Sequence, residues 1–149
     1  MPYSIIRREL TDSGCAIVVN DNPAEAKAAA GMLQKLGLTV DRFDCAAASL
    51  RFVDKHKVDL LLVPHVLPGK IGTHFLVSLA RQTNPHTAVI VTVPRHGSAP
   101  LHDVGLTLKS PLTLSGLFLA VAVGLKVERE RQKAAFVAHV PTVLRRATH

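Results

Sequence analysis

Apolar residues recur along the chain with two alternating periods, and this pattern predicts strands that alternate with helices. Short apolar or alternating runs typical of strands cover 15–19, 38–43, 58–63, 87–93 and 106–109. Apolar positions at helical spacing cover about 23–36, 45–56, 73–82 and 113–138. Runs such as CAIVV lack polar alternation and are typical of strands that are covered on both faces. The order predicts an α/β fold in which a parallel sheet lies between two layers of helices.

Local signals place the ends of several helices. Asn22 is a suitable N-cap for the first helix, and Asp44 is the expected cap of the second. The segment 94–105 contains two prolines and two glycines, so any helix there is short or broken. We expect the long last helix to end near Pro141 and the final eight residues to be frayed.

Composition indicates one globular domain and a basic C-terminal end. The 149 residues, 48% of them apolar, suit one hydrophobic core. The formal charge is +7, and basic residues after position 125 outnumber acidic ones by four, which favours acidic partners. We therefore divide the chain into an N-terminal arm (1–13), a globular domain (14–126) and a basic helical extension with a tail (127–149).

The two thiols and the absence of a leader-like segment favour a cytoplasmic protein. Cys15 and Cys45 lack metal-like spacing and are expected at opposite ends of neighbouring strands, too far apart for a disulfide. The N-terminus has no apolar run of signal-peptide length. The stretch 110–125 is uncharged for sixteen residues, just under the length of a spanning helix, so we expect no membrane span.

Motifs at the ends of the first and third strands are similar to those of a known family. In IVVNDNP, Asn20 and Asp21 follow the first strand, and DLLLVPHVLPGKIG places Pro64 at the end of the third. Their order and spacing over about 15–126 resemble the receiver domain of bacterial response regulators, the CheY-like fold. The resemblance implies a doubly wound, five-stranded parallel sheet of order 2-1-3-4-5, here with an extended C-terminal helix. It also implies that Asn20 and Asp21 stand for the acidic pair of receivers, and Pro64 for the phosphate-accepting aspartate.

The last two strands match the family less directly. A receiver's fourth strand ends in Ser or Thr, and that place falls on Val93, with Thr92 one step away. The family's Lys-Pro appears as KSP, so either Ser110 replaces the lysine or Lys109 has moved by one position.

This pocket lacks the chemistry that phosphorylation on the receiver pattern needs, namely a carboxylate nucleophile and oxygen ligands for Mg²⁺. Pro64 supplies neither, and no Asp or Glu occurs between Leu60 and His102. Asp59 lies at the other end of its strand, roughly 16 Å away at about 3.3 Å per residue. We interpret the site as a degenerate phosphorylation pocket and expect no metal, no cofactor and no enzymatic activity.

Histidines near the same edge of the sheet provide an alternative. Three of His65, His74, His96 and His102 could in principle meet a zinc ion, although no HxH or HxxxH spacing supports this. His65, next to the lost acceptor, could itself take phosphate. Solvated loop histidines are the interpretation we prefer.

The last helix is the expected site of protein contacts. Every residue from Leu117 to Leu125 is apolar or Gly, whereas a helix that covers a sheet with one face needs only an apolar stripe. We predict a homodimer interface that includes Phe118, Val121 and Leu125. Cover by the apolar N-terminal arm is the alternative.

Taken together, the sequence predicts a phosphorylation-independent pseudo-receiver that serves as a protein–protein interaction module in bacterial signalling. The alternative is a regulator that binds a cyclic dinucleotide or nucleic acid through the arginine-rich end. The residues of that second hypothesis are Arg129, Arg131, Arg145 and Arg146.

Overall fold

Strands and helices alternate along the computed structural model, which describes residues 14–94 and 105–148, with side chains described up to residue 134. The elements are β1 (Cys15–Val19), α2 (Pro23–Lys35), β2 (Thr39–Phe43), α3 (Ala46–Lys55), β3 (Leu60–Pro64), α4 (Thr73–Thr83), β4 (Ala88–Val93), β5 (Leu106–Lys109) and α5 (Leu114–Thr148). Each strand was predicted to within two residues of these bounds. The broken helix expected at 94–105 falls almost wholly outside the described residues.

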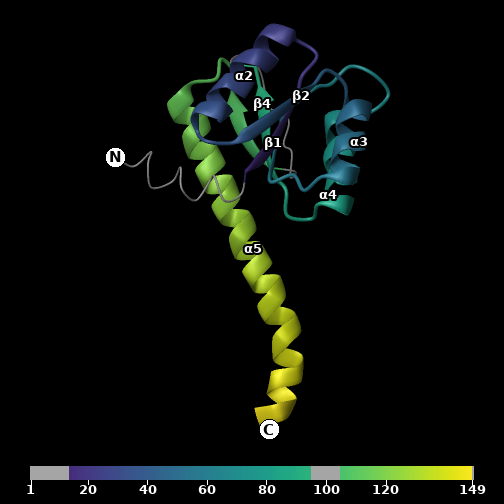
Figure 1. Ribbon diagram of the computed structural model, residues 1–149, viewed down its shortest axis with the longest axis vertical. Coiled ribbons are helices and arrows are strands. Elements are labelled where there is room, and N and C mark those ends of the chain that lie inside the picture. Colours follow the sequence, from purple (N-terminus) through teal and green to yellow (C-terminus); the bar gives the residue numbers. More distant parts are fainter. Residues whose placement is uncertain (1–13, 95–104, 149) are drawn as a thin grey trace.

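The five strands form one parallel sheet in the order β2-β1-β3-β4-β5, which confirms the predicted fold. Helices α2 and α5 cover one face of this sheet, and α3 and α4 cover the other (Figure 1). Because all strands are parallel, their carboxyl ends meet along one edge, which we call the carboxyl edge. The strand β2 lies at the side of the sheet and is half exposed, as its alternating sequence predicted.

Successive residues of the central strands point to opposite faces, so the sheet divides the core in two. Leu60, Leu62 and Ile90 pack toward α2 and α5. Leu61 and Val63, one position away, pack toward α3 and α4. Apolar side chains on both faces explain why these strands show no polar alternation.

One of the two predicted caps is confirmed and the other is wrong. The side chain of Asn22 accepts hydrogen bonds from the backbone N–H groups of Ala24 and Glu25, at 3.0 and 3.3 Å. The helix α3 is preceded by Cys45, which has extended backbone angles and makes no side-chain cap bond. Asp44 therefore lies one residue too early for its carboxylate to act as the N-cap.

The last helix runs through Pro141 to Thr148 instead of ending near Pro141. A proline inside a helix removes one backbone hydrogen bond, but its fixed φ near −65° is itself helical, so the backbone can continue. At about 1.5 Å per residue, α5 is about 50 Å long. Its N-terminal part packs on the sheet, and its C-terminal part projects away from the rest of the fold (Figure 1).

The predicted interface residues of this helix face inward, so that part of the prediction was wrong. Phe118, Val121 and Leu125 are 8%, 0% and 7% exposed and belong to the core beneath α2 and α5. The outward stripe is instead Leu119 and Val123, followed by Val127, which are 61%, 48% and 48% exposed. Because every residue from 117 to 125 is apolar or Gly, no polar position marks the outer face, and the inner face could not be chosen from the pattern.

A buried acid fixes α5 to the helix on the other side of the sheet. Glu128 is 7% exposed, and its Oε1 lies 3.8 Å from Arg81 Nη2 on α4 and 3.0 Å from Arg131 Nη1. Its Oε2 lies 3.7 Å from Nδ1 of His86, in the turn before β4. Burial lowers the pKa of Arg81, and the charge of Glu128 opposes this shift.

Hydropathy gives no membrane-crossing element in the part of the chain that the structure describes. There, no helix combines the length and the apolar character that a span across a bilayer requires.

Candidate functional site at the carboxyl edge

Pro64 ends β3 at the carboxyl edge, directly opposite Thr92 of β4. The next residue, His65, donates its N–H to the Thr92 carbonyl at 2.8 Å. Because consecutive backbone nitrogens point to opposite sides of a strand, the nitrogen of Pro64 faces β1, whose pairing with β3 has already ended at Val18 and Leu62. The missing N–H therefore breaks no bond of the sheet.

The carbonyl of Pro64 is also held in place. It accepts a 2.7 Å hydrogen bond from the Thr73 hydroxyl at the start of α4. The loop between them contains Gly69 at φ +105°, a conformation that favours glycine. The carboxyl end of β3 is thus held by hydrogen bonds to β4 and to the start of α4.

Asn20 and Glu25 form a small polar network beside this strand end. The Asn20 Oδ1 atom accepts from the Asn22 backbone N–H at 2.9 Å, and its Nδ2 donates to Glu25 Oε2 at 3.2 Å. Asp21 is exposed and does not line the cavity described below. Among the described residues, the acidic group that lines this cavity is therefore Glu25, which was not among the residues predicted for the pocket. Its place in the first turn of a helix that begins at the carboxyl edge was the signal that could have identified it.

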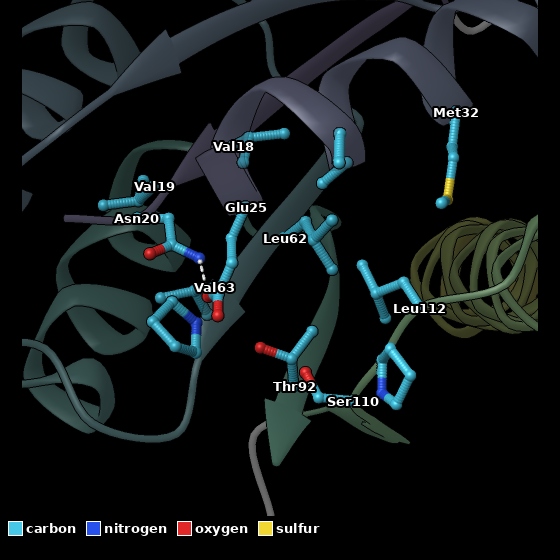
Figure 2. Close-up of a pocket in the computed structure, with 14 residues that line it drawn as sticks. Val18, Val19, Asn20, Glu25, Met32, Leu62, Val63, Thr92, Ser110 and Leu112 are labelled. Atoms are coloured by element: carbon cyan, nitrogen blue, oxygen red, sulfur yellow. Dashed lines mark hydrogen bonds between the residues drawn. The ribbon is translucent and has the colours of Figure 1, made fainter. Parts of the chain in front are cut away.

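A cavity of about 410 Å³ opens at the carboxyl edge, beneath α2 and beside the start of α5 (Figure 2). Its lining comes from the ends of the three strands β1, β3 and β4, from α2 and from the segment before α5. The lining residues are Val18, Val19, Asn20, Glu25, Ala28, Ala29, Met32, Leu62, Val63, Pro64, Thr92, Ser110, Pro111 and Leu112.

Strand alternation decides which of the predicted residues reach the cavity. Thr92 lines it, while Val93 is 2% exposed and does not, because the next residue along β4 points to the other face of the sheet. Ser110 lines it as well, and Lys109 is exposed outside it. Val93 and Lys109, which were predicted for the pocket, therefore do not line this cavity, and of the two alternatives for the KSP motif, Ser110 is the one that lines it.

The electrostatic character of the lining differs from that of a cation site. Among the described residues that line the cavity, Glu25 is the one that is ionisable. Within 14–94 and 105–148, the structure has no group of three or more His, Cys, Asp or Glu placed to hold a metal ion. His65 is half-buried and His74 exposed, and His96 and His102 lie outside the described residues.

Asp59 lies at the opposite edge, as its place at the start of β3 predicted. Its Oδ2 accepts from the Cys15 backbone N–H at 3.2 Å. Burial raises the pKa of Asp59, although that hydrogen bond and the positive charges of Lys57 and Arg129 oppose the shift. Burial also raises the pKa of the Cys15 thiol, helped by the charges of Asp41 and Asp59. Both cysteines are free.

The arginines of the second hypothesis are not gathered into one site. Arg131 pairs with Glu128, and the charge of Arg129 acts on Asp59. Arg145 and Arg146 lie on the projecting part of α5, and their side chains are outside the described set.

Solved structures of similar fold come from several organisms. A response regulator receiver protein from Sinorhizobium medicae superposes with a TM-score of 0.67 and 15% identity, over 77% of this chain and 96% of that one. A CheY-like receiver domain protein from Methanospirillum hungatei gives 0.68 and 18%, over 79% and 98%. A receiver domain of a putative Luxo repressor protein from Vibrio parahaemolyticus gives 0.69 and 18%, over 81% and 96%. At these identities the likeness shows the fold.

The sequence itself carries the family assignment. No curated protein matches the chain. The family model described as the response regulator receiver domain matches residues 16–107, from β1 into β5. The chain belongs to the response regulator receiver domain family, whose members act in two-component signal transduction.

Proposed function

We propose that this protein is a phosphorylation-independent receiver that acts through protein contacts in a bacterial, cytoplasmic signalling pathway. The observation that carries the proposal is Pro64, which occupies the end of β3 at the carboxyl edge in place of a carboxylate. A phosphoryl group cannot be accepted there, because the proline ring offers no nucleophilic atom. Receiver domains are generally signalling modules without enzymatic activity of their own.

The surroundings of Pro64 support the same conclusion. Mg²⁺ prefers several hard oxygen ligands, usually with carboxylates among them. Among the described residues, the cavity offers the carboxylate of Glu25 alone, which is already bonded to Asn20, while Asp21 lies outside. Apolar walls formed by Val18 and Leu62 add nothing that could replace the water shell of a cation.

The outer face of α5 supplies a surface for contacts. Leu119, Val123 and Val127 follow one another at a spacing of four residues, so they form one apolar stripe along the helix. Beyond Glu128 the helix projects from the fold, and a helix without tertiary packing is only marginally stable in water. A second copy of the chain would cover the stripe with an identical stripe and would give the projecting part a partner helix.

Beryllofluoride with Mg²⁺ tests the loss of phosphorylation. We expect the amide NMR resonances of Asn20, Asp21, Thr92 and Ser110 to stay in place during the titration, because the end of β3 presents Pro64 and not a carboxylate that could bind the fluoride complex. Saturable shifts at these residues would contradict the proposal.

The substitution Val123→Glu tests the interaction surface. Light scattering at micromolar concentration should show a dimer for the wild-type protein and a monomer for this variant, because each interface would bury two carboxylates. The matched control is Gln132→Glu, an exposed position on the same helix outside the stripe, which should remain dimeric. A monomeric wild-type protein would eliminate the homodimer.

A further inference from the structure

The cavity at the carboxyl edge has the dimensions of a ligand site. Its volume of about 410 Å³ lies within the roughly 300–1,000 Å³ typical of small-molecule pockets. Since a water molecule takes about 30 Å³ in the liquid, this space suits a molecule on the order of a dozen non-hydrogen atoms. The small side chains of Ala28 and Ala29 leave this room between α2 and the sheet.

Its inner walls are apolar. Val18 and Leu62 come from the sheet, and Met32 and Leu112 close the side toward α5 (Figure 2). An apolar group that displaces water from these walls gains free energy in proportion to the area it covers. Methionine and leucine side chains can also adjust to the shape of an occupant.

The polar groups gather at the mouth. Asn20, Glu25, Thr92 and Ser110 lie around the same opening in Figure 2. One carboxylate oxygen of Glu25 is taken by Asn20, which leaves the other to accept a hydrogen bond. Among the described residues, the hydroxyl groups of Thr92 and Ser110 have no hydrogen-bond partner. The mouth can therefore bind a head group that donates hydrogen bonds.

The charge of the lining selects among head groups. Glu25 contributes a carboxylate, and among the described residues that line the cavity there is no lysine, arginine or histidine to balance its charge. An anionic ligand such as a phosphate or a carboxylate would be repelled by the Glu25 carboxylate, whereas an ammonium group would be attracted.

We propose that this cavity binds a small amphipathic molecule with an apolar body and a head group that is an amine or an alcohol. The apolar body lies between α2 and the sheet, and the head group bonds to Glu25 with Thr92 and Ser110 nearby. The inference rests on the proposed function in one respect, since the cavity is free for a ligand only when the edge carries no phosphoryl group. Occupancy of this site would then be the signal that replaces phosphorylation.

Three probes with one apolar body and different head groups test the assignment. The full-length protein is titrated with 4-phenylbutylamine, 4-phenylbutanol and 4-phenylbutanoate, and binding is followed by amide and methyl NMR shifts. We expect saturable shifts at Ala28, Met32, Leu62 and Ser110 with the amine and the alcohol. The carboxylate should bind at least about tenfold more weakly than the amine, because a charge-assisted hydrogen bond is replaced by repulsion.

Variants on α2 locate the binding. Ala28→Leu places a larger side chain in the cavity at an exposed helix position, and it should weaken the binding of amine and alcohol at least about fivefold. Ala24→Leu is the matched control, since Ala24 is exposed on the same helix but lies outside the lining. Glu25→Gln should reduce the affinity for the amine to that of the alcohol and leave the alcohol unchanged.

Three results would overturn the inference: no saturable binding of amine or alcohol, binding that Ala28→Leu leaves intact, or equally tight binding of the carboxylate. An intact-mass measurement after treatment with acetyl phosphate separates this failure from failure of the proposed function. If the protein binds no ligand and gains no phosphoryl group, only the ligand site is refuted. If the protein gains a phosphoryl group, the proposed function is refuted.

Discussion

Neutralising the buried acid of α5 should destabilise the fold far more than the same change two residues away. Glu128 is 7% exposed and contacts Arg81, Arg131 and His86, which are themselves partly exposed. In Glu128→Gln the shape is kept, but the guanidinium of Arg81 loses the negative charge that offsets its burial. Removing one partner of a fully buried ion pair costs about 3–5 kcal/mol.

The partial exposure of the partners reduces that figure. The Arg131 side chain is 57% exposed, so its share of the loss is that of a surface pair, about 0.2–1 kcal/mol. The Arg81 side chain is 26% exposed and carries most of the remainder. We expect a loss of about 2 kcal/mol in the free energy of unfolding, which for a chain of this size corresponds to about 5–8 °C in Tm.

Chemical denaturation of Glu128→Gln and Glu130→Gln provides the comparison. Glu130 is exposed, and its substitution should change the free energy of unfolding by less than about 0.5 kcal/mol. Both changes are made in the Val123→Glu background, so that dimerisation does not add to the measured stability. The difference should persist in 1 M NaCl, because salt screens buried pairs less than exposed ones. If the two variants unfold at the same denaturant concentration, the assigned role of Glu128 in fixing α5 is wrong.

Two further predictions concern the opposite edge of the sheet and the basic end. Because burial raises the pKa of Asp59, its contribution to stability is fully present below the unfolded pKa and is lost as pH rises through the folded value. The stability of Asp59→Asn relative to wild type should therefore increase as pH rises past the ordinary pKa of an aspartate, and a difference that is the same at all pH values in urea titrations would contradict this. Because Arg131 is engaged by Glu128, duplex DNA and cyclic dinucleotides should show no saturable binding by fluorescence anisotropy at 0.15 M salt. Binding that weakens steeply with salt and disappears in the double variant Arg145→Ala/Arg146→Ala would favour the alternative function.

The fold could be predicted because strands and helices left clear periods in the sequence. Uninterrupted runs such as CAIVV and DLLLV mark strands that are covered on both faces, and β2 alternates because it lies at the side of the sheet. The ends of helices were less accessible. The shift of the α3 cap from Asp44 to Cys45 depends on where the backbone leaves the extended conformation, which composition does not reveal.

Orientation was the information that the sequence lacked. In 88–93 and 117–125 nearly every residue is apolar, so neither the side of β4 that bears Thr92 nor the outer face of α5 could be assigned. The same absence of a polar marker led to Phe118 for the interface, whereas Val93 was assigned to the pocket by counting to the end of the strand along the family's motif. Pro64, assigned by the same kind of counting, does end its strand.

Intact-mass spectrometry of the protein after incubation with Mg²⁺ and acetyl phosphate tests the loss of phosphorylation most directly. A functional receiver treated alongside serves as the positive control. We predict that the mass of this protein stays unchanged at neutral pH, because the end of β3 presents Pro64 to the cavity. A phosphoryl adduct localised to Asp21, Glu25 or His65 would contradict the account.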